Sequence, residues 1–92
     1  MGPWITTGIN PMKSMTRVKK NGKLEAEFAT GDMIFDATEY IVATTRYITL
    51  HPGDVIWLGS DGTVEMAPGD TIEISIDGVG TLRNEVVEEA GL

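Results

Sequence analysis

Cysteine is absent from the sequence. Disulfides, thiolate metal sites and a cysteine nucleophile are therefore excluded, and the absence favours a reducing compartment. The sequence also lacks an apolar run of about 18 residues, the length that a transmembrane helix needs. Its N-terminal stretch has neither the basic region nor the apolar core of a signal peptide. We therefore expect a soluble cytoplasmic protein with no membrane partner.

Basic residues are scarce, with 7 Lys and Arg against 14 Asp and Glu and a net charge of −7. Such a surface repels the phosphate backbone, which disfavours nucleic acid as a partner. Most of the basic residues fall between residues 13 and 23. We interpret them as the solvated face of a hairpin rather than as an anion-binding patch.

The chain is also short. Its 92 residues suffice for one domain and not for two. We therefore treat residues 1–92 as a single domain. So small a domain buries a modest fraction of its surface and is marginally stable unless it gains a partner. Glycine is abundant, with 11 residues, as is typical of a turn-rich β protein.

A β-hairpin is the clearest local prediction. Residues 15–20 and 23–29 read as strands on either side of Asn21-Gly22, a pair that accepts the positive φ angles of a tight hairpin turn. Alternation along the second strand predicts a buried face. That face would be formed by Leu24, Ala26 and Phe28.

One main helix is expected to begin after Asp36. Asp36 would cap it, with Glu39 three residues on reaching back, and Phe35 and Tyr40 could form a hydrophobic staple. Apolar residues recur at helical spacing as far as Ile48. The density of β-branched residues is unfavourable for an isolated helix, so tertiary packing must hold it.

Two Pro-Gly-Asp turns open a weak internal repeat, at residues 52–62 and 68–78. Each turn is expected to launch a strand. The strand at 55–58 is apolar on both faces, as in a strand covered on both sides, whereas the strand at 71–76 alternates. Further strands are predicted at 4–7 and 79–87, with a bulge at Gly80. The sequence thus predicts a β-rich α+β fold.

No catalytic residue emerges from the residues alone. His51 has no Ser or Cys partner at a recognisable spacing and suits a helix C-terminus. Glu25 and Glu27 form an E-x-E pair, but on a hairpin they are better explained as a solvent-facing row than as a metal site. The loop at 59–62 is a ligand-loop candidate, with a plain turn as an equally good alternative.

The chain resembles the C-terminal part of the fumarylacetoacetate hydrolase family over nearly its whole length. The likeness rests on six segments in the family's order: the GPWITT start, the Asn-Gly hairpin, the DMIF step, YITLHPGDVI, the second Pro-Gly-Asp, and the GVGTLRN ending. They lie at residues 2–7, 21–22, 32–35, 47–56, 68–70 and 78–84.

The resemblance implies a mixed β-roll fold, usually dimeric, around Mg²⁺ or Mn²⁺. Family enzymes act on 2-oxo or 1,3-dioxo carboxylic acids by hydrolysis, isomerisation or decarboxylation, and the metal stabilises the enolate that develops. The family's Thr-Gly-Thr-Pro loop corresponds here to 58–61, so the resemblance assigns Gly59 and Ser60 to substrate binding. Asp61 replaces the proline, which bears on substrate range.

The family's metal-binding carboxylates and active-site lysine lie upstream of the GPW segment, at which this sequence begins. We therefore expect this chain to bind no metal and to be inactive alone, as the C-terminal portion of a longer catalytic domain that the upstream part would complete. The expected protein partner is a second copy in a homodimer or a companion chain. The alternatives are a stand-alone, dimeric, non-catalytic β-rich module and a truncation of a longer protein.

Overall fold

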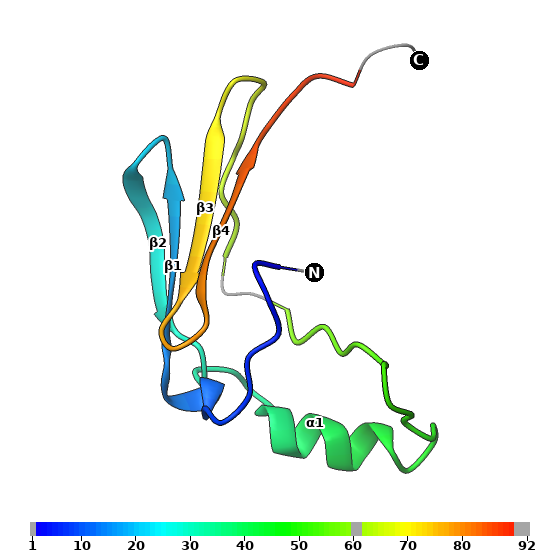
Figure 1. The fold of residues 1–92 in the computed structure, drawn as a ribbon. Helices are drawn as coiled ribbons and strands as arrows, with labels where there is room; N and C mark the ends of the chain where they lie inside the picture. Colours follow the sequence, from blue (N-terminus) through cyan, green and yellow to red (C-terminus); the bar gives the residue numbers. More distant parts are fainter. Residues whose placement is uncertain (1, 60–61, 90–92) are drawn as a thin grey trace.

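The computed structural model describes residues 2–59 and 62–89. Its centre is a four-stranded antiparallel sheet with the strand order β2-β1-β3-β4 (Figure 1). The strands are β1 (Met15–Lys20), β2 (Lys23–Ala29), β3 (Thr71–Ile76) and β4 (Gly80–Glu85). A short 3-10 helix, η1 (Pro11–Lys13), precedes β1, and one α-helix, α1 (Ala37–Thr44), follows β2. This arrangement confirms the β-rich α+β class, while closure into a β-roll stays a prediction for the complete domain.

The predicted hairpin is confirmed, and its turn also ties the two hairpins together. Asn21 and Gly22 have φ angles of 53° and 80°, as a tight hairpin turn requires. The Asn21 side chain accepts a hydrogen bond from the Thr71 amide at 2.9 Å and donates one to Asp70 Oδ1 at 2.9 Å. The Asn21 amide donates to the Thr71 carbonyl at 2.9 Å. The first hairpin is therefore fastened to the start of β3.

A β-bulge changes one face of this hairpin. Val18 pairs with Ala26 but Lys19 pairs with Leu24, so Glu25 is an extra residue in β2. A shift by one residue moves the following side chains to the other face of a strand. The prediction that Leu24 lies on the buried face is therefore wrong, and its side chain is 46% exposed.

The bulge expected at Gly80 is absent, because β3 and β4 pair in continuous register with Gly80 opposite Ile76. Gly80 has another reason to be glycine. Its φ is 133°, and a Cβ there would collide with the Trp4 ring. The Trp4 indole of the N-terminal segment thus lies against the backbone at the start of β4.

Both Pro-Gly-Asp turns have the same geometry, which confirms the repeat at the level of the turns. The carboxylate of Asp54 accepts a hydrogen bond from the His51 amide at 2.8 Å, and that of Asp70 accepts one from the Ala67 amide at 2.9 Å. The glycines of the two turns have φ angles of 94° and 93°, which fits the third position of a type II turn.

Only the second turn launches a strand. Residues 71–76 form β3, whereas residues 55–58 and 4–7 have no strand structure, so the strands expected there are wrong for this chain. A strand needs a neighbour that accepts and donates its backbone hydrogen bonds. β3 has β1 and β4 on its two sides, but neither of the other segments joins a ladder within the described part of the chain.

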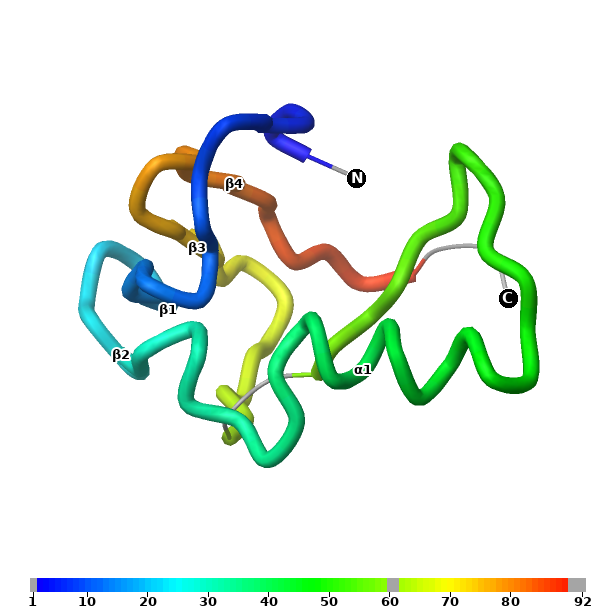
Figure 2. The backbone as a smooth tube through the Cα atoms, turned by 90° about the horizontal axis from the view of Figure 1, so that it is seen from below, coloured from blue at the N-terminus to red at the C-terminus, as the bar shows by residue number. Residues whose placement is uncertain are grey.

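The helix is shorter than its apolar pattern predicts. Asp36 caps it as expected, with the carboxylate accepting a hydrogen bond from the Glu39 amide at 2.8 Å. It ends at Thr44, and the Thr45 hydroxyl donates to the Ile41 carbonyl at 2.8 Å, a local bond that competes with further helix. No residue of α1 is buried. Both views show α1, in green, apart from the four strands, and Figure 1 places it beyond the ends of the strands (Figures 1 and 2).

One face of the sheet carries an ion-pair network. Arg17 Nε lies 3.1 Å from Glu27 Oε2, and Arg17 Nη1 lies 2.9 Å from Asp77 Oδ1. The second oxygen of Asp77 accepts a hydrogen bond from the Met15 amide at 3.2 Å. The hydrogen bond from Arg17 and, as a smaller contribution, that from the Met15 amide hold the pKa of Asp77 below its ordinary value.

Replacing Asn21 with alanine should weaken the sheet. Asn21→Ala removes two side-chain hydrogen bonds to the start of β3 and places alanine at a positive φ. We expect a loss of about 1–2 kcal/mol in the free energy of unfolding, measured by urea titration. Lys23→Ala, an exposed change in the same hairpin, should cost less than about 0.5 kcal/mol. Equal losses for the two variants would contradict the role of Asn21.

Acid should weaken the chain through Asp77. A carboxyl whose pKa is lowered by folding stabilises the fold at pH values above its unfolded pKa, here 3.8. This stabilisation is lost as the pH falls through the lower pKa of the folded state. The urea midpoint should therefore fall between about pH 7 and about pH 3. Asp77→Asn should flatten this dependence, and an unchanged pH profile in that variant would contradict the assignment.

Candidate ligand-binding pocket

The second face of the sheet is apolar. Cross-strand pairing places Val18 of β1, Ile74 of β3 and Leu82 of β4 side by side, with Thr16 and Ile76 forming the next row. Phe28 of β2 pairs with Thr16 and completes that row. We call these six residues the pocket face: Thr16, Val18, Phe28, Ile74, Ile76 and Leu82.

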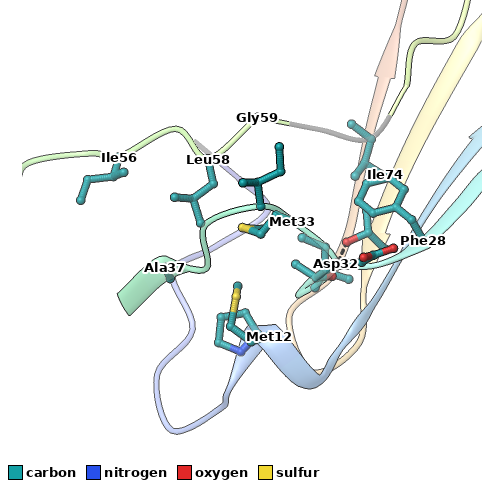
Figure 3. Close-up of a pocket in the computed structure, with 14 residues that line it drawn as sticks. Met12, Phe28, Asp32, Met33, Ala37, Ile56, Leu58, Gly59 and Ile74 are labelled. Atoms are coloured by element: carbon teal, nitrogen blue, oxygen red, sulfur yellow. Dashed lines mark hydrogen bonds between the residues drawn. The ribbon is translucent and has the colours of Figure 1, made fainter. Parts of the chain in front are cut away.

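A cavity of about 710 Å³ lies over this face. The sheet contributes one wall, and η1, the loop after β2 and residues 56–59 contribute the others (Figure 3). Its lining is mostly apolar, as is usual for ligand pockets. The lining residues are Pro11, Met12, Thr16, Phe28, Thr30, Asp32, Met33, Ile34, Ala37, Ile56, Leu58, Gly59, Ile74 and Ile76.

Two hydroxyl groups bring polarity to the sheet wall. Thr16 and Thr30 are joined by a hydrogen bond of 2.5 Å between their side-chain oxygens. Thr16 is 5% exposed and is the one buried residue of the described chain. Because each hydroxyl combines a donor with two acceptor lone pairs, this pair is satisfied internally and still has acceptor capacity.

The loop after β2 is seated against η1. A Cβ on Gly31 would collide with the Met12 carbonyl oxygen, so only glycine allows this approach. The Asp32 amide donates to the Ala29 carbonyl at 2.9 Å, and the Met33 amide donates to the Gly31 carbonyl at 3.0 Å. This turn brings Asp32 and Met33 into the wall of the pocket.

Gly59 lies in the pocket wall at the end of the 56–59 segment (Figure 3). Its φ is 86°, and a Cβ there would meet open space, so the need for glycine is conformational and not a matter of packing. Ser60, the other predicted substrate-binding residue, lies outside the described residues, as does Asp61. The role of both predicted residues stays a prediction.

The structure gives a local setting for the other residues considered from sequence. The His51 amide is held in the first Pro-Gly-Asp turn by Asp54. Glu25 lies at the bulge, and Glu27 is paired with Arg17. Over residues 2–59 and 62–89, no group of three or more His, Cys, Asp or Glu side chains could hold a metal ion.

Sequence reasoning missed most of the pocket. Met12, Met33 and the Thr16–Thr30 pair come together only because η1 and the loop after β2 fold over the end of β1. The packing of Gly31 against the Met12 carbonyl had no signal in the local sequence pattern.

No helix in the described part of the chain has the length and hydrophobicity to span a membrane.

Comparison with known proteins gives consistent results. The profile of the fumarylacetoacetate (FAA) hydrolase C-terminal family matches residues 1–87. The chain is 37% identical over 93 residues to the 4-hydroxyphenylacetate degradation bifunctional isomerase/decarboxylase of Salmonella dublin. This match covers 97% of this chain and 22% of that protein.

Solved structures share the fold. The 5-carboxymethyl-2-hydroxymuconate delta-isomerase from Mycobacterium smegmatis superposes with a TM-score of 0.88 at 36% identity, over 96% of this chain and 36% of that one. Maleylpyruvate hydrolase from Sphingobium sp. SYK-6, in complex with manganese(II) and pyruvate, superposes with a TM-score of 0.86 at 34% identity, over 94% of this chain and 34% of that one.

This chain thus spans between about a fifth and just over a third of the length of these relatives. Isomerase, decarboxylase and hydrolase activities all occur among them. The match over residues 1–87 and the shared fold establish that the chain belongs to the fumarylacetoacetate hydrolase family.

Proposed function

We propose that this chain is the C-terminal portion of a divalent-metal-dependent cytoplasmic enzyme that acts on 2-oxo or 1,3-dioxo carboxylic acids. The observation that carries the proposal is the similarity over nearly the whole chain to isomerase, decarboxylase and hydrolase relatives. The manganese and pyruvate held by the Sphingobium hydrolase support the metal and the oxo-acid class for the complete enzyme.

The contribution of this chain is to bind the substrate carboxylate through Gly59 and Ser60. Gly59 in the wall of the apolar cavity supports this role, because a residue without a side chain lets a ligand approach the backbone closely. A serine hydroxyl at the next position supplies a donor for a carboxylate oxygen. Hydrogen bonds to charged groups are roughly twice as strong as neutral ones, so two such donors would fix the acid end of the substrate.

The donor set of the described residues does not fit a divalent metal, because no three carboxylates or imidazoles converge. Oxygen-coordinated Mg²⁺ relies on carboxylates together with substrate and water ligands. We therefore assign the metal ligands to the rest of the complete enzyme. This chain by itself would lack turnover, and a companion polypeptide that carries the metal ligands would complete the enzyme.

A second candidate is a stand-alone, dimeric β-rich interaction module without catalytic activity. The observation that favours it is the exposure of large apolar side chains across the chain, including Tyr47 at 89% and Trp57 at 86%. Exposed apolar surface of this kind marks interaction sites. A pure chain that forms a stable homodimer and never supports turnover would favour this module over the enzyme fragment.

The pure chain should not turn over oxo-acids in the presence of Mg²⁺ or Mn²⁺. It should also give no heat of binding when these ions are titrated into it in the presence of oxalate, a mimic of the enolate. The reason is that the residues described by the structure contain no ligand set for these ions. Calorimetry and an assay with maleylpyruvate check both expectations. Measurable metal-dependent turnover by the chain alone would overturn the assignment of the ligands to another part of the enzyme.

The roles of Gly59 and Ser60 can be tested in a chimera in which this chain replaces the matched third of the Sphingobium hydrolase. Ser60→Ala should lower kcat/KM about 10- to 100-fold, because it removes one hydrogen bond to a charged group. Gly59→Ala should lower kcat/KM as well. Thr63→Ala, which removes an exposed hydroxyl three residues further on, is the matched control. A kcat/KM for Ser60→Ala equal to that of the control would remove Ser60 from the site.

A further inference from the structure

One asparagine of the chain stands directly before a glycine. The three asparagines and the residues that follow them are Asn10-Pro11, Asn21-Gly22 and Asn84-Glu85. Asparagine is a thermolabile residue, because the backbone nitrogen of the next residue can attack the carbon of its side-chain amide. Proline has no N–H for this reaction, whereas glycine has no side chain to hinder it. Asn21 is therefore the asparagine whose sequence neighbour favours the reaction most.

The hairpin turn leaves this bond accessible. Asn21 and Gly22 are both exposed, and a Cβ on Gly22 would meet no atom within 4 Å. Asn84 lies instead within β4, where it is paired with Ile72 of β3. Neither crowding nor lack of water protects Asn21, so the position of its side chain governs its reactivity.

Residues at the start of β3 hold that side chain. Its oxygen accepts a hydrogen bond from the Thr71 amide at 2.9 Å, and its nitrogen donates one to Asp70 Oδ1 at 2.9 Å. The other oxygen of Asp70 accepts a hydrogen bond from the Ala67 amide at 2.9 Å. Both ends of the Asn21 amide are thus engaged by another segment, and turning it toward the Gly22 nitrogen requires a local opening of these bonds.

The charge of Asp70 decides what loss of the amide would do to the fold. The hydrogen bond from Asn21 and, as a smaller contribution, that from the Ala67 amide hold the pKa of Asp70 below its ordinary value. Asp70 is therefore ionised at neutral pH. An aspartate at position 21 would have no N–H to donate, and it would place a carboxylate oxygen where a nitrogen now lies 2.9 Å from Asp70. Two carboxylates at such a distance disfavour each other's charged form.

We propose that Asn21 is a site of spontaneous deamidation, and that its conversion to aspartate or isoaspartate unfastens β3 from the first hairpin. In this reaction the Gly22 nitrogen bonds to Asn21 Cγ and gives its proton to solvent, while the Cγ–Nδ2 bond breaks and the side-chain nitrogen takes up a proton and leaves as ammonia. Water then opens the cyclic imide. Cleavage at Cγ gives aspartate, and cleavage at the main-chain carbonyl gives isoaspartate, in which the backbone runs through Cγ.

Both products act on the same end of the β1–β3 ladder. Aspartate leaves the backbone unchanged but loses the hydrogen bond to Asp70. Isoaspartate adds a methylene to the main chain at a residue whose φ of 53° suits the tight turn, which displaces the bond of 2.9 Å from the Asn21 amide to the Thr71 carbonyl. The inference is independent of the proposed function, because Asn21, Asp70 and Thr71 do not line the pocket.

The first test follows each amide by peptide mass mapping while the pure chain is incubated at neutral pH. Asn21 should convert while Asn10 and Asn84 keep their amides. Asp70→Ala releases the Asn21 side chain and should speed its conversion roughly 10-fold, the effect of losing one hydrogen bond to a charged group. Asp54→Ala removes the equivalent carboxylate from the first Pro-Gly-Asp turn and should leave the rate unchanged. Equal rates for the two variants, or conversion of another asparagine before Asn21, would overturn the proposal.

The second test measures what the product does to the fold. In a urea titration, Asn21→Asp should lower the ratio of folded to unfolded chain about 10-fold. Asn10→Asp makes the same change of charge at an exposed side chain whose oxygen accepts a hydrogen bond from the Met12 amide. This matched control should change the ratio by no more than about twofold. An Asn21→Asp variant as stable as the control would overturn the proposal.

A swap of the two groups keeps the test decisive if Asn21→Asp unfolds the chain. In the double variant Asn21→Asp/Asp70→Asn, an amide nitrogen at position 70 donates to a carboxylate at position 21, and the Ala67 and Thr71 amides keep their acceptors. The double variant should therefore recover most of the lost stability, with circular dichroism as the check on folding. A double variant no more stable than Asn21→Asp would show that repulsion from Asp70 is not what unfastens β3, and the proposal would fall.

Discussion

The fold depends on the pairing of β1 with β3, because these two strands join hairpins that lie about fifty residues apart in the chain. Polar side chains fasten both ends of this ladder. At one end Asn21 bonds to Asp70 and Thr71, and at the other Asp77 bonds to the Met15 amide and to Arg17. These bonds hold the long-range pairing in register where a buried apolar core would do so in a larger domain.

The two faces of the sheet follow from that register. Arg17 and Glu27 meet on one face, whereas Thr16, Val18 and Ile74 meet on the other. The bulge at Glu25 moves Leu24 off the apolar face. The sheet therefore has one polar, solvated face and one apolar face that borders an open cavity.

The same asymmetry links the fold to family membership. Gly59 reaches the cavity from a segment that follows a well-formed Pro-Gly-Asp turn but does not join the sheet. The role proposed for Gly59 requires the rest of the enzyme, which agrees with a chain that spans about a third of the solved family structures.

The sequence by itself determined the features that depend on near neighbours. Asn21-Gly22 specified the hairpin turn, Asp36 specified the start of α1, and the two Pro-Gly-Asp turns formed with matching geometry. Each of these is a hydrogen bond or a φ angle shared among a few consecutive residues, so local chemistry suffices. The motifs also identified the family, which the profile match confirmed.

Only the tertiary structure decided the features that need a partner from elsewhere in the chain. The apolar run at 55–58 follows the same Pro-Gly-Asp turn as β3, yet of these two segments only β3 has neighbours that complete its ladder. The helical pattern extended to Ile48, but without packing on the sheet α1 ends at Thr44. The pocket likewise required Met12 and Gly31 to meet across separate segments. Strand pairing and side-chain burial are long-range, and a local pattern states what a segment can do without stating what it will contact.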